Sequence, residues 1–501
     1  MPVFLLNPDH RFRQESAVRA ATTTRRHLLV AAFAAAAAGC SPAPGADVAA
    51  QPDPGARLES ALLPTFTIRG EPVPARSLAG RMDELGVPGV SVAVLADGEI
   101  AWARGYGFAD AESRRPVTTN TLFQAASISK PVAALAALQL VEEGRVDLDG
   151  DVNNHLTSWT LRGNGFTADA PVTLRHLLTH RAGLTVWGFP GYGPGETPPD
   201  AVGVLDGRGN TDPVRVDKTP GESWRYSGGG YTVMQQLVAD VRGSPFAEVM
   251  REHVLDPLGM VRSTYEQPIP PERRDDIATG HRPDGTPVPA GWHTYPEQAA
   301  AGLWTTPGEL ALYAREVQRA WAGVSTRVLG ERLVRAMLTP DEDDWGLGPG
   351  ISEDGKRFRH GGSNQGFRST FSAFIDGDDG VFVMTNSDSG SGLATEIAVT
   401  LADEYGWSGP RPDERVPVDL PVAAREEYVG TYVVPGRGIE FSVRLEDRGL
   451  ELSWDGETVV LRPVNDTVFF DTGDGREVHF SRSDGEMALI LGGLTAIRGG
   501  S

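Results

Sequence analysis

The chain has 501 residues, of which 40% are hydrophobic, and a formal net charge of −21 at pH 7. This length is enough for two or three domains, and the hydrophobic content is enough for a large core. The acidic balance argues against a nucleic-acid partner and against binding to anionic lipid through a basic patch. Cys40 is the only cysteine in the sequence, which excludes an internal disulfide bond.

Residues 1–39 are predicted to be a signal peptide of the twin-arginine type. A pair of arginines precedes an apolar run, residues 28–38, that is too short to span a bilayer. The run ends beside Cys40, in a sequence similar to a lipoprotein cleavage site. We expect export to the periplasm or the outer face of the membrane, with Cys40 lipidated as a tether. The alternative is that Cys40 is removed with the signal peptide. Residues 40–60, rich in alanine and proline, are predicted to be flexible.

Residues 61–408 are predicted to form the main domain. Near its beginning, the segments Pro88–Ala96 and Glu99–Phe108 have the composition of two strands. They flank Asp97-Gly98, a pair that is typical of a two-residue hairpin turn. The sequence therefore predicts a β-hairpin here.

Helical patterns dominate residues 127–320 of this domain. A stretch rich in glycine and proline, residues 186–221, interrupts them and is long enough to act as a lid or wall of a site. Strand patterns return at Thr370–Ile375 and Val381–Thr385. Because the strands lie at both ends of the domain, we expect one antiparallel sheet with a helical insert between its two halves.

A proline-bearing linker, residues 409–420, is followed by short strands separated by Asp/Gly turns. This pattern predicts that residues 421–501 form a small β-barrel or sandwich. The predicted strands are Tyr428–Tyr432, Glu440–Leu445, Leu450–Trp454, Val459–Leu461 and Val478–Ser481.

The segment Ser127-Ile128-Ser129-Lys130 places a hydroxyl and an amine three residues apart. A helix is predicted to begin here, since Pro131 is tolerated only in a first turn and an apolar stripe follows. On a helix, residues i and i+3 share a face, so an unprotonated Lys130 could take the proton of Ser127. The alternative is structural: Ser127 caps the helix and Lys130 is a solvated side chain.

Two later stretches weigh against that alternative. Tyr226-Ser227-Gly228 lies on a predicted glycine-rich turn before a helical pattern, and His360-Gly361-Gly362-Ser363 precedes a predicted strand that begins at Phe367. With Ser127 and Lys130, in this order, they resemble the three motifs of the serine β-lactamase and penicillin-binding protein superfamily. Further segments, from residue 75 to residue 405, resemble landmarks of that family. They are Phe123–Ser127, Leu140–Leu148, Leu174–Leu184 and Pro257–Met260.

The resemblance implies an α+β fold of the β-lactamase/transpeptidase type, an antiparallel sheet flanked by helices with a helical insert. The small all-β domain that follows is similar to the lipocalin-like appendage of some family members. Ser127 would be the nucleophile that forms an acyl-enzyme, and Tyr226 would pass a proton to the leaving group. Lys130 would be the proton acceptor, or the cation that keeps Tyr226 ionisable. The backbone N–H groups of Ser127 and Ser363 would form an oxyanion hole. Gly361 and Gly362 suit a strand that a substrate approaches closely.

The second and third motifs depart from the family pattern. Gly228 stands where the family has an asparagine, and His360-Gly361-Gly362 stands where it has Lys-Thr-Gly. In β-lactamases and D-Ala-D-Ala peptidases, the missing groups engage the amide and the carboxylate of the substrate. A neutral His360 would bind a carboxylate poorly, although Arg368 is near enough in sequence to supply a cation. These departures favour an ester or small amide over a β-lactam.

His176 and His180 have the spacing of a metal-binding pair on a helix, but the intervening residues lack the glutamate of a zinc hydrolase motif. We expect both to be structural, and we expect neither a metal nor a cofactor. The leading hypothesis is an exported serine hydrolase acting on esters or on D-amino-acid and other small amides. The alternatives are a cell-wall D-Ala-D-Ala carboxypeptidase or β-lactamase and, in another class, a non-catalytic binding or regulatory lipoprotein.

Overall fold

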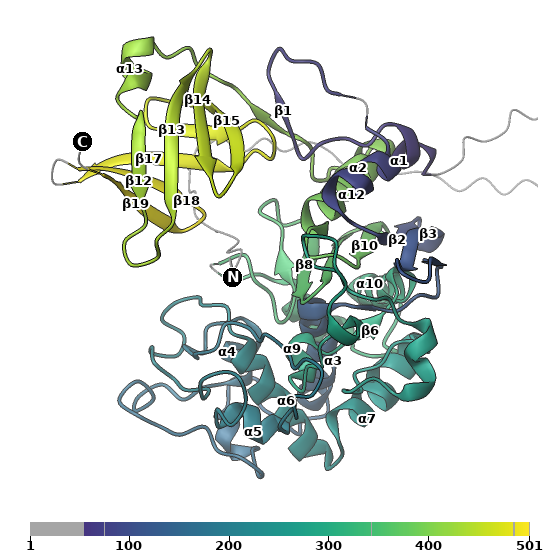
Figure 1. Cartoon of the computed structure of the whole chain (residues 1–501). Coiled ribbons are helices and arrows are strands. Elements are labelled where there is room, and N and C mark those ends of the chain that lie inside the picture. The colour runs from purple at the N-terminus through teal and green to yellow at the C-terminus, as the bar shows by residue number, and fades with distance from the viewer. Residues whose placement is uncertain (1–54, 75, 342, 484–485, 500–501) are drawn as a thin grey trace, which may run out of the picture. The chain divides into compact units, whose positions relative to one another are not determined.

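The computed structural model describes residues 55–74, 76–341, 343–483 and 486–499 (Figure 1). The predicted signal peptide and Cys40 lie outside these residues. The described chain divides into two compact units. The larger one extends to Asp413 without Ile68–Gly70, and the smaller one holds Ile68–Gly70 and the residues from Glu414 onward. Among the described residues, no helix combines the length and the apolar character that crossing a membrane requires.

The larger unit contains an antiparallel sheet of seven described strands in the order β4-β3-β2-β10-β9-β8-β7. As predicted, strands from both ends of the domain meet in it, because β10 pairs with β2. The predicted hairpin is also confirmed, since φ is positive at both turn residues, 52° at Asp97 and 75° at Gly98. The strands are β2 (Gly89–Ala96), β3 (Glu99–Asp110), β4 (Arg115–Pro116), β7 (Gly350–Ile351), β8 (Arg357–Asn364), β9 (Phe367–Phe374) and β10 (Gly380–Thr385).

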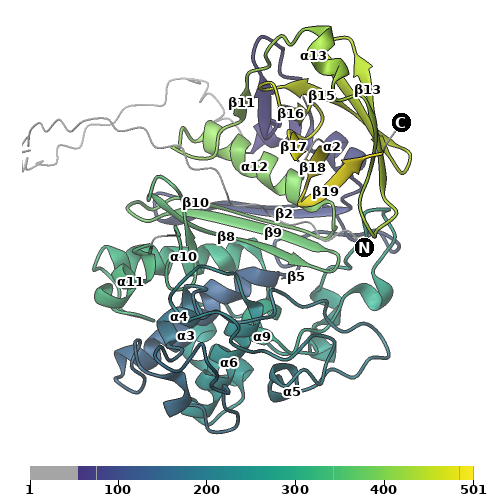
Figure 2. The same cartoon turned by 90° about the vertical axis from the view of Figure 1, so that its left-hand side faces the viewer.

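Helices cover both faces of this sheet (Figure 2), and alternate strand residues belong to two different core clusters. Val90 and Val92 of β2 pack toward α1, α2 and α12, whereas Ala93 and Phe382 belong to the core on the side of α3 and α10. The helices are α1 (Ala56–Ser60), α2 (Leu78–Leu85), α3 (Ser129–Glu142), α4 (Leu174–Leu178), α5 (Ala201–Leu205), α6 (Gly228–Arg242), α7 (Phe246–Met250), α8 (Asp256–Leu258), α9 (Gln298–Ala301), α10 (Pro307–Trp321), α11 (Glu331–Leu338) and α12 (Gly390–Glu404).

Two segments differ from the sequence-based expectation. The described end of the predicted tether, residues 55–60, is ordered: it contains α1, and Leu58 is fully buried against the sheet. The predicted linker, residues 409–420, contains β11 (Asp413–Arg415), which pairs with β1 (Phe66–Ile68). The alanine- and proline-rich composition predicted flexible segments. It did not reveal that Leu58 would be buried or that β11 would pair with β1.

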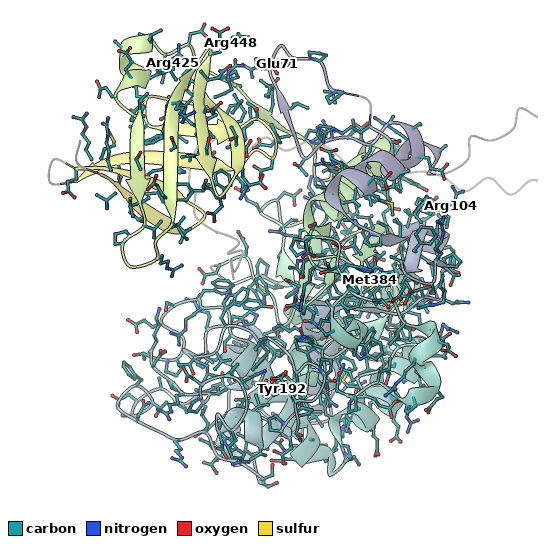
Figure 3. The ribbon with its side chains drawn as sticks, viewed as in Figure 1. Glu71, Arg104, Tyr192, Met384, Arg425 and Arg448 are labelled. Carbon is teal, nitrogen blue, oxygen red and sulfur yellow. The ribbon has the colours of Figure 1, made fainter. Side chains whose placement is uncertain are left out.

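The glycine- and proline-rich stretch, residues 186–221, is packed against the helical insert. Tyr192, labelled in Figure 3, is buried, and its backbone exchanges two hydrogen bonds with that of Thr294, of 2.8 and 2.9 Å. Its hydroxyl accepts a hydrogen bond of 3.1 Å from the N–H of Asn210. Because both its backbone and its side chains are held, this stretch is a wall of the domain in this structure.

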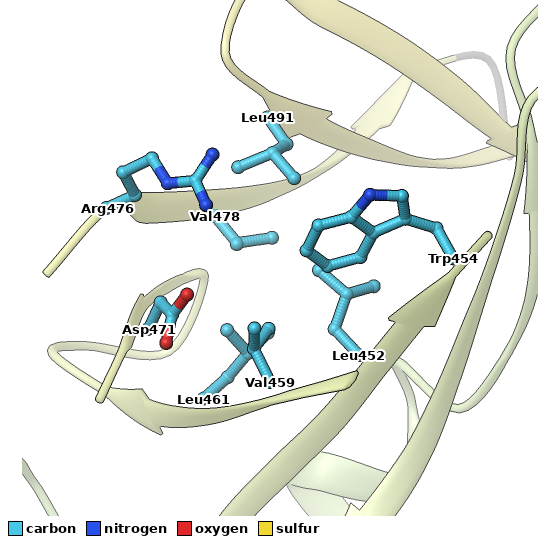
Figure 4. A pocket seen from close by; sticks show the side chains of 8 residues that line it. All are labelled: Leu452, Trp454, Val459, Leu461, Asp471, Arg476, Val478 and Leu491. Carbon is cyan, nitrogen blue, oxygen red and sulfur yellow. The ribbon is translucent and has the colours of Figure 1, made fainter. Parts of the chain in front are cut away.

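The smaller unit contains a closed barrel of eight described strands, β12 to β19. Tyr432, Phe469 and Leu489 are fully buried in its core, and eight residues line a small cavity within the unit (Figure 4). The sequence did not indicate β16, β18 or β19. Besides α13 (Val422–Glu426), the elements are β12 (Gly430–Val433), β13 (Glu440–Glu446), β14 (Gly449–Trp454), β15 (Glu457–Pro463), β16 (Val468–Asp471), β17 (Glu477–Ser483), β18 (Glu486–Leu491) and β19 (Leu494–Arg498).

Candidate active site

Ser127 lies in a single 3-10 turn, η1 (Ala126–Ile128), between the short strand β5 (Phe123–Gln124) and α3. β5 pairs with β6 (Trp304–Thr305). Ala126 has a φ of 51°, a left-handed conformation that is strained for a residue with a side chain. Its neighbours are fully buried and Ser127 is partly exposed. The turn therefore presents the Ser127 hydroxyl from an otherwise buried segment.

Lys130 lies in the first turn of α3, where Pro131 is tolerated because a first-turn N–H has no partner within the helix. Its Nζ is 3.0 Å from Ser127 Oγ and donates a hydrogen bond of 2.8 Å to the carbonyl of Ala300, at the end of α9. The side chain is buried, and among the described residues no carboxylate forms an ion pair with it. Burial therefore lowers the pKa of Lys130 to about 7. A large share of such an amine is unprotonated at neutral pH and can accept the proton of Ser127.

Tyr226 directly precedes α6, whose N-cap is Ser227. Its hydroxyl is hydrogen-bonded with the side chain of Ser127, and its ring lies 4.8 Å from Lys130 Nζ. Burial raises the pKa of Tyr226 well above the ordinary value of a tyrosine. One role that the resemblance implies for Lys130 is to favour the ionised form of Tyr226. Burial works against this role, because it favours the neutral hydroxyl. The glycines from Gly228 onward belong to α6, so the predicted turn ends at the N-cap.

The third motif lies on β8, at the edge of the sheet. β7 pairs only with Phe358 and Arg359, so within the described residues β8 has no strand partner on that side from His360 onward. Gly362 packs against the segment that leads to Ser127, because a Cβ at this glycine would overlap the carbonyl oxygen of Ala125. The same carbonyl accepts a hydrogen bond of 3.0 Å from Ser369 Oγ. These contacts hold β8 beside η1.

His360 shares the face of β8 that points toward the helical insert, since it is paired with Phe371 of that core. Its Nδ1 donates to the carbonyl of Gly361 over 2.6 Å. Burial, and then the charge of Lys130, lower the pKa of His360 to about 3. The imidazole is therefore neutral at physiological pH and offers no fixed positive charge.

Gly228 is covered by the wall segment. Its N–H donates a hydrogen bond of 3.0 Å to the carbonyl of Trp187. A Cβ at this position would lie 2.9 Å from a ring carbon of Phe189 and 3.2 Å from the same carbonyl. The position at which the family has an asparagine side chain is therefore filled by the carbonyl of Trp187 and the ring of Phe189.

The structure does not bring Arg368 to this site. Arg368 is paired with Ser363, whose side chain faces away from that of His360 because strand residues alternate. Its guanidinium donates to the carbonyls of Asn364 and Phe367 and forms an ion pair of 2.8 Å with Asp388, just before α12. The expectation that Arg368 could supply a cation to the substrate is therefore wrong for this arrangement.

His180, which the sequence predicts to be structural, lies within the site. Its ring centroid is 4.2 Å from that of Tyr226. Its Nδ1 accepts a hydrogen bond of 3.1 Å from the N–H of Ser227, so a neutral His180 carries its proton on Nε2. His176 instead forms a capping box with Thr173 at the start of α4. The helix ends at Leu178, and His180 has a φ of 60°, which turns it away from the face of His176.

The comparison with known proteins agrees with this arrangement. The family model described as Beta-lactamase matches residues 75–404, and the chain belongs to this family of serine hydrolases. Esterase EstB of Burkholderia gladioli is 34% identical over 206 residues, which are 37% of this chain and 51% of that protein. The matched region thus spans about half of the esterase.

Two further similarities extend over most of the chain. Penicillin-binding protein 4* of Bacillus subtilis (strain 168) is 24% identical over 433 residues, which cover 80% of this chain and 92% of that protein. The structure of the octameric penicillin-binding protein homologue from Pyrococcus abyssi is similar to this one, with a TM-score of 0.60 and 25% sequence identity. It covers 84% of this chain and 98% of that chain. The fold predicted for the main domain is thereby confirmed.

Proposed function

We propose that the protein hydrolyses neutral esters through an acyl-enzyme on Ser127. The observation that carries this proposal is the pairing of a partly exposed hydroxyl with a buried lysine, 3.0 Å from Ser127 Oγ to Lys130 Nζ. Burial lowers the pKa of Lys130 to about 7, so the amine is available as a base at neutral pH. A lysine with a purely structural role would be solvated or paired with a carboxylate.

In the acylation step, Ser127 Oγ bonds to the carbonyl carbon of the ester and its proton moves to Lys130 Nζ. The bond from that carbon to the alkoxy oxygen then breaks. Tyr226 donates its hydroxyl proton to the departing alcohol and recovers a proton from Lys130. A water molecule next bonds to the acyl carbon and loses a proton to Lys130 Nζ. The bond from that carbon to Ser127 Oγ then breaks, and the proton passes from Lys130 to Oγ, which releases the acid and free Ser127. Tyr226 enters this sequence as a neutral acid, consistent with the raised pKa of its hydroxyl.

The developing oxyanion would be bound by the backbone N–H groups of Ser127 and Ser363. Both lie on segments whose relative position is fixed by the close contact of Gly362 with the carbonyl of Ala125. Removing one such donor from an enzyme typically lowers kcat by about 10²- to 10³-fold. Gly361, where a Cβ would have no neighbour closer than 3.8 Å, leaves room for a substrate along the open edge of β8.

The preference for neutral esters rests on the altered motifs. His360 is neutral, Gly228 is covered, and Arg368 is on the other face of the sheet. A charge-assisted hydrogen bond contributes about 1.5–3 kcal/mol, so a substrate that needs its carboxylate bound loses this contribution here. The relationship to an esterase supports the same choice. The second candidate, a D-Ala-D-Ala carboxypeptidase, is favoured by the relationship to a penicillin-binding protein and by the open edge of β8.

The experiment is active-site labelling combined with a substrate comparison. A fluorophosphonate should modify the peptide that contains Ser127, as mass spectrometry will show, and Ser127→Ala should abolish labelling and turnover. For the wild type, kcat/KM for p-nitrophenyl butyrate should exceed that for a chromogenic cephalosporin and for a D-Ala-D-Ala peptide. Unchanged labelling of Ser127→Ala would disprove the mechanism, and a faster cephalosporin or peptide would disprove the substrate preference.

We further propose that the mature protein is exported and tethered to the membrane through lipidated Cys40. The support is in the sequence alone: paired arginines, a short apolar run and a cysteine beside it. Palmitate labelling in the native host should be lost in Cys40→Ala. Equal labelling of both forms would reject the tether, and a mature N-terminus beyond Cys40 would do the same.

A further inference from the structure

A tryptophan lies beside each of the two positions at which the motifs depart from the family. The first is Trp187, whose carbonyl covers Gly228. Its ring centroid is 5.5 Å from that of Tyr226, and 52% of its surface is exposed. An indole with this exposure, held by its backbone next to the proton donor of the site, is available to a bound substrate.

The second is Trp345, which lies beside His360. The two ring centroids are 5.5 Å apart and nearly perpendicular, and Trp345 is also 6.0 Å from Tyr226. Trp345 is partly exposed and is connected to Gly350, at the start of β7, by a β-bridge. The ring therefore lies at the end of β8 that holds the third motif.

The charges around these rings do not favour an anionic substrate. His360 is neutral, and Lys130 is buried with its Nζ 4.8 Å from the centre of the Tyr226 ring. Next to Trp345 in the sequence, Asp343 and Asp344 are exposed carboxylates. Asp343 is paired with Arg181 over 2.6 Å, which places that guanidinium in an ion pair. The acidic neighbours therefore disfavour an anion, and the flat apolar rings suit an aromatic group.

We propose that Trp187 and Trp345 select esters that carry aromatic rings on both sides of the scissile carbonyl. Trp187, whose carbonyl covers Gly228 at the position of the family asparagine that engages the amide of the acyl part, binds a ring on the acyl group. Trp345, which lies beside His360 of the motif that engages the carboxylate in the family, binds a ring on the alcohol group. This inference rests on the proposed esterase function and names its substrate class.

The test uses two matched pairs of esters that differ only in whether a six-membered ring is aromatic. Ethyl phenylacetate and ethyl cyclohexylacetate report on the acyl side, and benzyl acetate and cyclohexylmethyl acetate report on the alcohol side. In each pair, kcat/KM of the wild type should be about threefold to tenfold higher for the aromatic ester. Because each pair has similar leaving groups, the ratio measures ring recognition.

The variants separate the two sides. For each pair, the ratio is kcat/KM of the aromatic ester divided by that of the saturated ester. Trp187→Ala should reduce the ratio of the acyl pair to about one and leave the ratio of the alcohol pair unchanged. Trp345→Ala should do the reverse. Trp187→Phe and Trp345→Phe should keep both ratios. Trp321→Ala serves as the matched control, because Trp321 ends α10 and packs on Arg335. Leucine replacements keep apolar volume without an aromatic ring. If an alanine variant does not fold, the leucine variant takes its place and should give the ratios expected of alanine.

The outcomes distinguish this inference from the proposed function. Wild-type protein that hydrolyses none of the four esters would contradict the esterase function itself. Hydrolysis that depends on Ser127, with both ratios near one in the wild type, would overturn only the aromatic selectivity. Ratios that stay high in the alanine or leucine variants would overturn the assignment to these two tryptophans.

Discussion

At the scale of single residues, burial determines the chemistry of this site. Lys130 has no carboxylate partner among the described residues, and removal of water is the cause that lowers its pKa to about 7. The same burial raises the pKa of the neighbouring Tyr226. One environment therefore holds the lysine as a base and the tyrosine as an acid, which is the pair of roles that acyl transfer requires.

The state of Lys130 predicts a pH dependence. Only the neutral amine accepts the proton of Ser127, so kcat/KM for a neutral ester should rise with pH through an inflection near the lysine pKa of about 7 and then level off. Lys130→Ala should lower kcat/KM by about 10²-fold or more. Lys130→Arg, which keeps a positive charge but cannot act as a base, should be as inactive as the alanine variant. If the activity of Lys130→Arg were near that of the wild type, Lys130 would act only through its charge.

Tyr226→Phe gives a separate prediction, because it removes the hydroxyl and keeps the ring that contacts Lys130 and Trp187. We expect kcat to fall by about 10²-fold, since the leaving alcohol loses its proton donor. Esters with more acidic alcohols need less protonation, so the loss should be smaller for p-nitrophenyl than for ethyl esters. An equal loss for both leaving groups, measured as kcat/KM, would argue against a role in proton donation.

His180 is expected to position Tyr226. It fixes the Ser227 N–H by a hydrogen bond and packs on the Tyr226 ring. Replacement by asparagine tolerates the positive φ of this residue but removes the ring. We expect His180→Asn to lower kcat by roughly tenfold with little change in KM, as for a misplaced catalytic group. His176→Asn is the matched control on the neighbouring helix and should leave the kinetics unchanged. A loss that appears only in KM would contradict the positioning role.

At the scale of elements, the site depends on how closely β8 approaches η1. Gly362 has the carbonyl of Ala125 where its Cβ would be, whereas a Cβ at Gly361 has no neighbour closer than 3.8 Å. The two adjacent glycines therefore form a matched pair. Gly362→Ala must push β8 away from Ser127 and separate the two proposed oxyanion donors.

We expect Gly362→Ala to lower kcat by about 10²-fold or more, which is the cost of a lost oxyanion donor. Gly361→Ala should retain most of the activity on a short ester. Circular dichroism and thermal unfolding of both variants will separate loss of fold from loss of geometry. Equal activities of the two folded variants would show that the approach of β8 is not required.

The elements also show what the sequence could predict. The hairpin β2–β3, the start of α3 and the strands β9 and β10 have strong local patterns, and each forms where it was expected. Which face of β9 carries Arg368 was not predictable, because a shift of one residue in register reverses every side chain. His180 was missed because α4 ends at Leu178, two residues before it, and helix spacing no longer applies. The tryptophans of the site come from segments far apart in the chain, so no local pattern joins them.

At the scale of the whole molecule, one buried acid affects stability. Glu297, at the start of α9, is fully buried, and neither of its carboxyl oxygens has a hydrogen-bond partner among the described residues. Burial raises its pKa to about 8 from an ordinary value of 4.5. Between these two values, the unfolded chain releases the proton and the folded protein keeps it. The folded state therefore loses stability as the pH rises from 4.5 to about 8, and the penalty is constant above that.

Glu297→Gln removes the ionisable group and keeps its shape. We expect the Tm of the variant to be close to that of the wild type near pH 5. By pH 8.5, the Tm of the variant should exceed that of the wild type by on the order of 2 °C or more. Thermal unfolding across this pH range measures the difference. A gap between the two proteins that does not widen with pH would mean that Glu297 is not the buried acid responsible.

The pairing of Thr385 with Val90 in the sheet has a consequence for how the chain reaches its active form. During synthesis, β2 and β3 emerge first. They remain without β10 while the helical insert, which lies between β3 and β10 in the chain, is made. Contacts this distant in sequence slow folding and leave apolar strands exposed in the meantime. The edge of β8 beside Ser127 is also made late, so a nascent or truncated chain that ends before residue 357 carries the nucleophile without its oxyanion site. Hydrolytic activity can therefore begin only once the domain is complete.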